Sequence, residues 1–575
     1  MSKRRFLPRI WLLAVCTCTS VFAAPEPPIY NNRAMRHPES GVQGMVSSRE
    51  KLASEAGLAV LRQGGNAIDA AVTVGFVMAV TTPQAGNLGG GGFMLIHLAD
   101  TQADVAIDYR EKAPLAATRD MFLDANGDVD KERSRYSHQS AGVPGTVAGL
   151  ALALKKYGTL TLAEAMAPAI ELAANGFPVN EDLYQSLNTG RERLSRHAPH
   201  ALPLFYDAEG RARPPGEMIK LPELAATLRL IAEDGPDAFY RGRIADLIVS
   251  DMAAHGGIIT HADLAAYQPA ERVPVRGTYH DYEIVSMPPP SSGGVHIVQI
   301  LNILEPLGLK AKGHNSAATI HLMAEAMKYA YADRSKHLGD SDYHPVPIEW
   351  LTSKAYADEI RTKMNLERAT PSTDILPGEP PAEGTDTTNF TVMDQFGNAV
   401  ANTYTINFSF GSKIMPPGTG FFLNNEMDDF SSKPGVPNAY GLIGGDYNAI
   451  ESEKRMLSSM SPTIVLRDGI PVLATGSRGG SQIITATLQV ILNVLEHDMN
   501  IAEAVAAPRI HHQWLPDILR LERGVSADTQ LLLRDRGYEL QEGSAMGTTN
   551  SITQQDGAFF GAADPRRPDS HAAGF

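Results

Sequence analysis

The stretch TTNFTVMDQFGNAVANTYTINF, residues 387–408, holds the pattern that decides the fold. Polar and apolar residues alternate along TNFTVMD and again along NAVANTYTINF, which is the period of a half-buried strand. The residues between them, Asp394 to Asn398, have the composition of a tight turn. Two alternating segments joined by such a turn predict an antiparallel β-hairpin.

The composition changes abruptly just before this hairpin. From about residue 366 the chain reads ERATPSTDILPGEPPAEGTD, which is rich in Pro, Gly and acids and predicts an exposed loop. Thr387 and Thr388 therefore stand where this loop meets a strand. A cut before Thr387 would leave its hydroxyl beside a free α-amine, whose pKa of about 7.7 to 8 suits a general base. The pair alone is a weak signal, because threonine is common in strands.

Apolar residues at helical spacing predict helices along most of the chain. The predicted helices span residues 49–63, 67–80, 145–156, 161–174, 222–233, 238–254, 294–304, 316–333 and 481–495. Ser47 or Ser48 would cap the first helix and Asn66 the second, which is apolar nearly all round and should be buried. SPTIVLRD and IPVLATGS predict a second hairpin, and no internal repeat is present.

Two loops resemble binding motifs only superficially. GNLGGGGF, residues 86–93, lacks the Lys-Ser/Thr of a phosphate-binding loop and leads into a predicted strand at 93–97 instead of a helix. Its glycines are better explained by close backbone approach. DANGDVD, residues 124–130, has its glycine at the fourth position and not at the sixth of a calcium loop, which favours a surface turn.

Residues 1–23 have the pattern of a secretory signal peptide, which implies a periplasmic or secreted protein. A basic start, MSKRR, precedes an apolar run at 10–15, and cleavage is expected after Ala23. A membrane anchor would need about 20 apolar residues, and Val15 makes a poor match to a lipoprotein signal; both alternatives stay open. Both cysteines, Cys16 and Cys18, lie in this leader, so the mature chain would form no disulfide.

The composition describes a globular chain with a small-molecule partner. The 575 residues are 43% hydrophobic and 20% charged, which suffices for a large core. The formal charge is −15, and loss of the leader removes four cations and no acids, leaving −19. This balance argues against nucleic acid and anionic membrane surfaces as partners, because phosphate groups require neutralisation by Lys and Arg.

Long motifs in one order resemble a known family. They are TTNFTV (387–392), NTYTINFSFGSKI (402–414), FLNNEMDDFS (422–431), MLSSMSPTI (456–464), GSRGGSQII (476–484) and APRIHHQWLPD (507–517). Together with residues 44–92, they make the chain similar to the γ-glutamyltransferases (γ-glutamyltranspeptidases), with weaker colinear similarity between the blocks. The resemblance covers essentially the whole mature chain.

The resemblance implies a self-cleaving enzyme with an N-terminal nucleophile. Thr387 would attack the carbonyl carbon of Asp386, cut the chain before itself, and then act as the nucleophile. Thr405, on the second strand of the hairpin, would hydrogen-bond the Thr387 hydroxyl. Backbone N–H groups at Gly479 and Gly480 would form the oxyanion hole, where the lack of side chains permits close approach.

The resemblance also implies a pocket for the γ-glutamyl group, with a cation and anions on opposite sides of a zwitterionic head. Arg110, with Ser458 and Ser459, would bind the α-carboxylate, and Asn407, Glu426 and Asp429 would receive the α-ammonium. Residues 433–448 resemble a lid loop, with Tyr440 as the gate over the pocket. No metal or organic cofactor is implied.

Three residues depart from the common family pattern. Arg478 replaces the proline that usually precedes the two glycines and adds a cation near the oxyanion hole. Asn389 stands where a histidine is frequent, and Glu426 where some bacterial relatives have glutamine. These changes leave the acceptor preference and the pH optimum open.

The implied fold is α+β, a four-layer αββα sandwich of the N-terminal nucleophile hydrolase type. A large subunit, residues 24–386, and a small catalytic subunit, residues 387–575, would build it together. The implied reaction transfers the γ-glutamyl group of glutathione or a γ-glutamyl amide to water, an amino acid or a dipeptide. A glutaryl-cephalosporin acylase of the same fold and a secreted binding protein that never matures are the alternatives.

Overall fold

The computed structural model describes residues 34–375, 387–433, 445–543 and 545–575. The predicted signal peptide, Asp386 and the lid residue Tyr440 lie outside these residues. Among the described helices, none combines the length and the apolar character needed to cross a membrane.

The first of two large sheets has seven antiparallel strands and contains the predicted hairpin. In spatial order its strands are β20 (His571–Gly574), β2 (Gly44–Ser48), β10 (Thr387–Asp394), β11 (Ala399–Thr405), β3 (Gly91–Leu98), β4 (Ala103–Asp108) and β7 (Ala270–Arg272). The alternating pattern of residues 387–405 thus forms the two central strands, β10 and β11, and the turn lies at Asp394 to Asn398 as predicted.

The second large sheet has eight strands. Along its main path it runs through β1 (Glu39–Gly41), β19 (Ala558–Ala563), β18 (Thr548–Gln555), β13 (Ile470–Thr475), β12 (Thr463–Arg467), β9 (Tyr282–Ser286) and β8 (Val275–Tyr279), while β14 (Ser477–Arg478) pairs with β18. The predicted second hairpin is the β12–β13 pair. Two small sheets are formed by β15 (Ile510–His511), β16 (Leu519–Leu521) and β17 (Leu540–Glu542), and by β5 (Phe177–Pro178) and β6 (Met218–Ile219).

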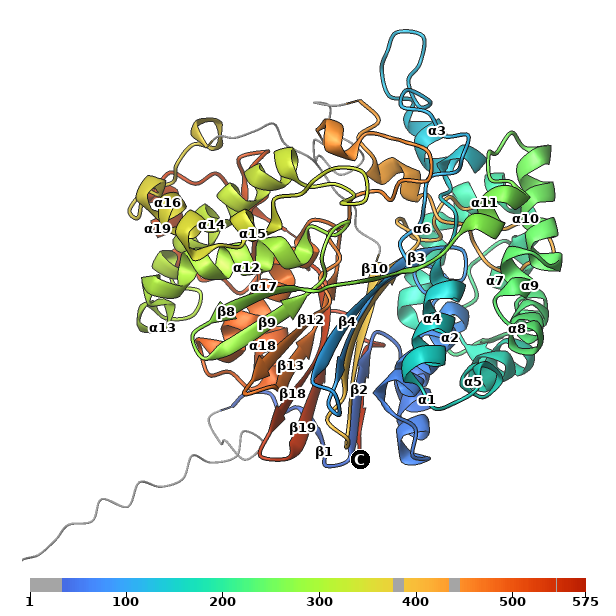
Figure 1. Cartoon of the computed structure of the whole chain (residues 1–575), viewed down its shortest axis with the longest axis horizontal. Coiled ribbons are helices and arrows are strands. Elements are labelled where there is room, and N and C mark those ends of the chain that lie inside the picture. Colours follow the sequence, from blue (N-terminus) through green and yellow to red (C-terminus); the bar gives the residue numbers. More distant parts are fainter. Residues whose placement is uncertain (1–33, 376–386, 434–444, 544) are drawn as a thin grey trace, which may run out of the picture.

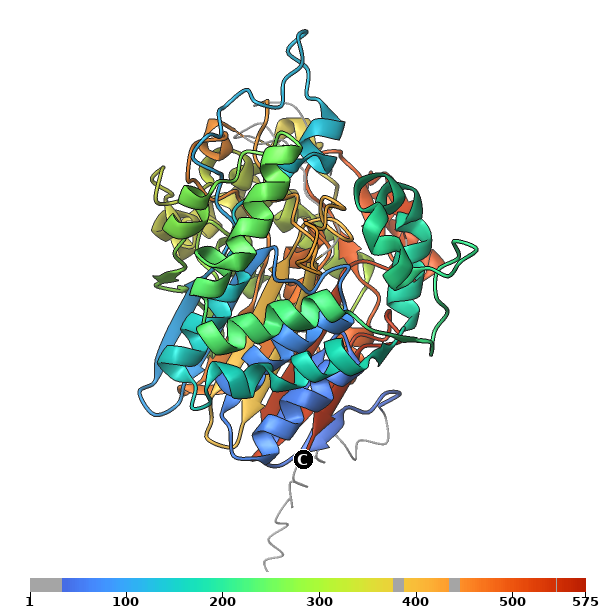
Figure 2. The ribbon, with the colours of Figure 1, turned by 90° about the vertical axis from the view of Figure 1, so that its right-hand side faces the viewer.

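Helices cover the outer face of the first sheet, on the right in Figure 1 and toward the viewer in Figure 2. They are α1 (Lys51–Arg62), α2 (Ala67–Thr81), α4 (Thr146–Tyr157), α5 (Leu162–Asn175), α6 (Glu181–His197), α7 (Leu202–Phe205), α8 (Pro222–Asp234), α9 (Asp237–Tyr240), α10 (Arg243–Ala254) and α11 (His261–Ala266). Every residue of α2 is buried, because this helix lies between the sheet and α5. Asn66 caps it with a reciprocal bond from Asp69, as its sequence predicted.

A second helical layer covers the other sheet, on the left in Figure 1. It consists of α12 (Gly293–Leu304), α13 (Leu309–Lys312), α14 (Ala317–His337), α15 (Ile348–Leu351), α16 (Lys354–Lys363), α17 (Gln482–Leu495), α18 (Ile501–Ala506) and α19 (Ala527–Asp535). The chain also contains α3 (Lys131–Tyr136) and short 3₁₀ turns, among them η2 (His138–Ser140), η5 (Ser372–Asp374) and η6 (Glu426–Asp429).

The two sheets pack face to face, which completes the four layers. Neighbouring residues of one strand point to opposite cores: Met45 belongs to the cluster between the sheets, and Val46 to the cluster under α1 and α2. Each sheet contains strands from both sides of Thr387. The αββα arrangement predicted from the resemblance is therefore the observed fold.

Two local predictions were wrong. Glu50, not Ser47 or Ser48, caps α1, because its carboxylate accepts from the backbone N–H groups of Leu52 and Ala53 at 3.0 and 2.9 Å. The helix expected over 238–254 is broken into α9 and α10, because the backbone leaves the helical conformation at Arg241 (φ −136°, ψ −13°) and Gly242 (φ −97°, ψ −157°).

Candidate functional site

The start of the hairpin places the two predicted threonines opposite each other. Thr387 is the first residue of β10, and its backbone is in register with Thr405, the last residue of β11. Thr405 is buried, and its Oγ1 accepts the backbone N–H of Asn407 at 2.8 Å. Asn407 has a positive φ of 70°, a conformation that asparagine tolerates better than most residues. The chain thus turns sharply next to Thr405.

The predicted oxyanion-hole glycines lie between β14 and α17, where the backbone conformation requires glycine. Gly479 has φ +119° and Gly480 has φ +60°. A Cβ on Gly479 would also lie 3.1 Å from the Cα of Gly547. Positive φ values aim successive backbone N–H groups in directions that a helix or strand does not offer, which is what an oxyanion hole needs.

A small, partly open cavity contains most of the predicted site residues. Its volume is about 20 Å³, enough for about one water molecule. It is lined by Arg110, Thr405, Asn407, Glu426, Asp429, Ser458, Ser459, Met460, Gly480 and Ile483. All six residues expected to bind the glutamyl head line this cavity together with Thr405 and one of the two glycines. These six residues come from distant segments, with Arg110 and Ser459 lying 349 positions apart in the sequence.

Arg110 lies at the centre of the cavity wall and is fully buried. It follows β4, and its guanidinium donates from Nη1 to Glu426 Oε1 and from Nη2 to Asp429 Oδ2, both at 2.5 Å. A buried cation needs such partners, because an unpaired charge in the interior is costly. The expectation that the cation and anions stand apart on opposite sides is not met in this ligand-free chain, where they touch.

Each of these two carboxylates has one oxygen without a hydrogen-bond partner among the described residues, called its reserve oxygen. Glu426 Oε2 and Asp429 Oδ1 are buried and have no hydrogen-bond partner in the part of the chain that the structure describes. Burying an acceptor without a partner typically costs about 1–3 kcal/mol. Two such acceptors side by side at one cavity form a site for a donor that the chain itself does not supply.

Three carboxylates surround the single Arg110 cation, and their pKa values are shifted accordingly. Burial raises the pKa of Glu426 well above its usual value, with Glu111 adding to the effect. Burial also raises the pKa of Asp429 to about 6 and that of Glu111 to about 7, against the lowering effect of Arg110. For Arg110, burial lowers the pKa, but the attraction of Glu426 and the other acids outweighs it and raises it overall.

Sequence reasoning missed two members of this site. Glu111, adjacent to Arg110, is completely buried, and its carboxylate lies 3.7 Å from the guanidinium. Arg334 of α14 is also buried and donates from Nη2 to Ser459 Oγ at 3.1 Å and from Nε to Ser292 Oγ at 2.7 Å. Burial lowers the pKa of Arg334 to about 10. No signal in the sequence marked Arg334, whose neighbours in the chain are Asp333 and Ser335.

The serine pair is held between this arginine and the backbone. Ser292 donates from its N–H and from Oγ to the carbonyl of Ser458, both at 2.8 Å. Ser458 Oγ accepts the N–H of Met460 at 3.1 Å. The loop carrying both hydroxyls is therefore fixed by Ser292 and Arg334, and it lines the cavity together with Arg110, which suits a carboxylate ligand.

The acidic wall of the cavity is formed by η6, which other residues hold in place. Ser134 donates to Asp428 Oδ1 at 2.8 Å, and Arg135 of α3 lies 3.3 Å from the same oxygen. Asn448 Nδ2 donates to the carbonyl of Asp429 at 2.8 Å. The position of Asp429 therefore depends on segment 131–140 as well as on its own turn.

Two departures from the family pattern lie behind the site. Arg478 donates to Thr548 Oγ1 at 3.2 Å and helps to lower the pKa of buried Asp182, although Arg49 contributes more. It is not among the cavity-lining residues. The side-chain Oδ1 of Asn389 accepts from Asn550 Nδ2 at 3.1 Å. Both side chains therefore bind β18 or its neighbours.

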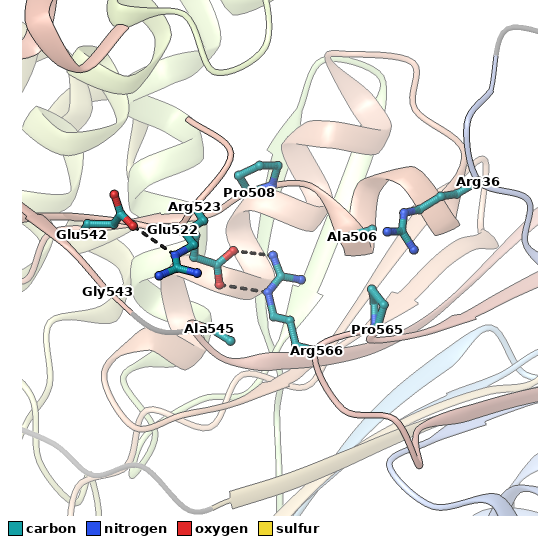
Figure 3. A pocket seen from close by; sticks show the side chains of 10 residues that line it. All are labelled: Arg36, Ala506, Pro508, Glu522, Arg523, Glu542, Gly543, Ala545, Pro565 and Arg566. Carbon is teal, nitrogen blue, oxygen red and sulfur yellow. Dashed lines mark hydrogen bonds and ion pairs between the residues drawn. The ribbon is translucent and has the colours of Figure 1, made fainter. Parts of the chain in front are cut away.

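A larger cavity lies elsewhere, against the C-terminal part of the chain. It has a volume of about 750 Å³ and is shown in Figure 3. Its main charged groups are already paired, Arg566 with Glu522 and Arg523 with Glu542. It contains none of the predicted catalytic or substrate-binding residues.

Comparison with known proteins decides the family. The sequence model described as gamma-glutamyltranspeptidase matches residues 53–574. The chain belongs to the γ-glutamyltranspeptidase family. Among γ-glutamyltranspeptidase relatives, the glutathione hydrolase proenzyme of Escherichia coli strain K12 is 51% identical over 583 residues and covers 100% of both chains.

Solved structures agree with the γ-glutamyltranspeptidase fold. A cephalosporin acylase from Bacillus halodurans superposes with a TM-score of 0.84 at 29% identity, covering 96% of this chain and 99% of that one. γ-Glutamyltranspeptidase of Helicobacter pylori gives a TM-score of 0.56 at 48% identity over 57% of this chain and 93% of that one. Both chemistries therefore occur on this fold.

Proposed function

We propose that this chain is a self-processing γ-glutamyltransferase and glutathione hydrolase. The observation that carries the proposal is the cavity beside the start of β10, where Thr387 begins the strand and a buried cation, two hydroxyls and two half-satisfied carboxylates converge. Family membership and the proenzyme name of the E. coli relative support self-processing.

Maturation would begin with the hydroxyl of Thr387. Its oxygen attacks the carbonyl carbon of Asp386, the peptide nitrogen leaves, and the resulting ester is hydrolysed by water. The products are a large fragment, residues 24–386, and a small fragment, residues 387–575, with Thr387 as its new N-terminus. Since both sheets contain strands from each side of the cut, the fragments would stay associated as one fold.

The mature enzyme would use ping-pong chemistry. The α-amine of Thr387 takes the proton from its own hydroxyl, which attacks the γ-carbonyl of the donor. Backbone N–H groups at Gly479 and Gly480 stabilise the negative oxygen, and Thr405 positions the nucleophile. For glutathione the first leaving group is Cys-Gly, and water or an amino acid or dipeptide acceptor then takes the γ-glutamyl group.

The glutamyl head would enter by exchanging ion-pair partners. Its α-carboxylate binds Arg110 and the hydroxyls of Ser458 and Ser459. Its α-ammonium donates to Asn407 and to the reserve oxygens of Glu426 and Asp429. The zwitterion is neutral overall, so it inserts into the existing pairing without adding net charge to a buried site. Because the cavity has room for only about one water molecule, its walls must part to admit the glutamyl head.

Secretion and lid closure belong to the same proposal. The basic and apolar pattern of residues 1–23 supports export to the periplasm or medium. The Pro- and Gly-containing loop 433–448 supports a lid with Tyr440 over the site, which would shield the acyl intermediate from water. No nucleic acid or membrane partner is needed.

A cephalosporin acylase is the second candidate, because the Bacillus halodurans structure has that activity in its name. A glutaryl group has no α-ammonium, however, and would leave the reserve oxygens of Glu426 and Asp429 unsatisfied. Turnover of γ-glutamyl anilide well above that of glutaryl anilide supports the proposal. The reverse preference would favour the acylase.

The maturation step is tested by substitution within one strand. Thr387→Ala should give one inert chain, since the attacking hydroxyl is gone. Thr391→Ala, a buried threonine of the same strand, is the matched control and should still give two fragments and turnover. Two fragments from Thr387→Ala would contradict the assignment, and a wild-type chain that stays intact would indicate a binding protein that never matures.

A further inference from the structure

A second cluster of chemically active side chains lies in the helical layer over the first sheet. His138 of η2 meets Asp251 and His255 at the end of α10. The His138 Nε2 to Asp251 Oδ2 distance is 2.9 Å, and the His255 Nδ1 to Asp251 Oδ1 distance is 3.2 Å. The three ligand-type atoms all lie within 4.8 Å of one another. None of the three residues lines the glutamyl cavity.

The backbone holds this cluster in place. Asp251 and His255 are four residues apart on α10 and its C-cap, so they share one face of the helix. The chain then turns back at Gly257, whose Cβ, if present, would lie 2.9 Å from the Cβ of His138. Gln139 Nε2 donates to the carbonyl of Gly256 at 3.2 Å. The two segments are therefore packed together by contacts that do not involve the imidazole nitrogens.

The two imidazole rings pack against each other, so the exposed His255 ring would turn for both nitrogens to point at one ion. The rings of His138 and His255 are stacked, with centroids 4.6 Å apart and planes 14° from parallel. Their side chains differ in access, 14% exposed for His138 and 57% for His255, while Asp251 is 8% exposed. One side of the cluster is thus formed by protein and the other faces solvent.

We propose that His138, Asp251 and His255 bind one divalent transition-metal ion, with zinc as the best match. Two imidazole nitrogens and one carboxylate oxygen are ligands that zinc takes readily, and bonds of about 2.0–2.1 Å in a tetrahedron place ligand atoms about 3.3 Å apart. Each histidine nitrogen already lies near this separation from one oxygen of Asp251, His138 Nε2 at 2.9 Å from Oδ2 and His255 Nδ1 at 3.2 Å from Oδ1. The three ligand atoms, one from each residue, lie within 4.8 Å of one another and would close in on the ion. Water from the exposed side would fill the fourth position.

This ion takes no part in the proposed γ-glutamyl chemistry; it links two segments of the helical layer. One is the end of α10, and the other runs through η2 to α3, where Ser134 and Arg135 hold Asp428 of η6. Bound metal would restrain the segment that supports the acidic wall of the glutamyl cavity. We expect a rise in Tm on binding, because a ligand that binds only the folded state stabilises it.

The test is a calorimetric titration of metal-free protein, without a histidine tag, with ZnCl₂ at pH 7.5. His255→Ala removes one ligand from a solvent-exposed position, so the fold should survive. His261→Ala is the matched control, because the His261 side chain is about equally exposed, at 56%, and its Nε2 lies 3.5 Å from Oδ1 of Asp246 on α10. Among the described residues this pair has no third ligand. A second variant, Asp251→Asn, removes the shared carboxylate.

Wild type and His261→Ala should bind one zinc ion with equal affinity and show the same rise in Tm. Both ligand variants should bind at least about 10- to 100-fold more weakly, the loss typical even of outer-shell partners. Equal zinc affinity in wild type and His255→Ala, or no saturable binding in wild type, would overturn the proposal. The Thr387→Ala precursor should bind zinc as wild type does, so the result does not depend on maturation.

Discussion

Replacing Asp429 by asparagine removes a charge that the proposed function uses for one purpose, to receive the substrate α-ammonium. Asp429 Oδ2 already pairs with Arg110, and Oδ1 has no partner among the described residues. The variant has the same shape, and Arg110 keeps its bond to Glu426, so the buried cation is not orphaned. The fold should therefore persist.

The size of the effect follows from the interaction that is lost. A hydrogen bond to a charged group contributes about 1.5–3 kcal/mol, which is about 10- to 150-fold in affinity. Since Glu426 Oε2 remains available, we expect the lower half of this range, about a 10- to 40-fold rise in KM for γ-glutamyl anilide. The value of kcat should change little, because the ammonium is bound alike in ground and transition states.

The assay compares γ-glutamyl with glutaryl anilide on each variant. Glutaryl anilide lacks the ammonium, so its kcat/KM should change by less than about threefold in Asp429→Asn. Asp237→Asn is the control, because Asp237 is an exposed carboxylate of α9 that does not line the cavity. An equal loss for both substrates in Asp429→Asn would refute the reasoning, since the variant would then have damaged the pocket in general.

Three further predictions follow from the same geometry. The pKa of Asp429 is raised to about 6, so the ionised form that accepts the ammonium is lost as pH falls through that value. Inhibition by L-glutamate should therefore weaken by up to about tenfold per pH unit below pH 6. The same loss of affinity at low pH in Asp429→Asn would contradict this prediction. Gly480→Ala, at φ +60°, should lower kcat by about 10²- to 10³-fold with little change in KM, measured on protein shown by gel to be cleaved; unchanged kcat would exclude it from the oxyanion hole. Arg334→Met should raise KM about tenfold for γ-glutamyl and glutaryl anilides alike, because both substrates carry the carboxylate that Ser459 would bind. A loss for only one of the two substrates would argue against a role of Arg334 in positioning Ser459.

The fold was predictable where local pattern and tertiary structure agree. The alternation across 387–405 became β10 and β11, and the apolar run after Asn66 became the buried helix α2. The helix α6 was missed because it is mostly polar and only Leu183, Leu187 and Leu194 supply its apolar face. The break between α9 and α10 lies at the non-helical backbone of Arg241 and Gly242, which apolar spacing does not reveal.

The site was predictable in its members but not in its arrangement. The motifs supplied Arg110, Glu426 and Asp429, whereas their direct contact joins positions 316 and 319 residues apart. Glu111 and Arg334 went unnoticed because their importance comes from burial beside these groups. The His138 and Asp251 pair, 113 residues apart, likewise needed the folded chain.

The most direct test of the whole account is the sequence of the shorter fragment of purified wild-type protein. N-terminal sequencing with intact mass should give Thr-Thr-Asn-Phe-Thr, a chain that starts at Thr387 and ends at Phe575. A fragment that starts at any other residue, or a full-length chain with γ-glutamyl turnover, would contradict the account, because the free amine of Thr387 would then not be the catalytic base.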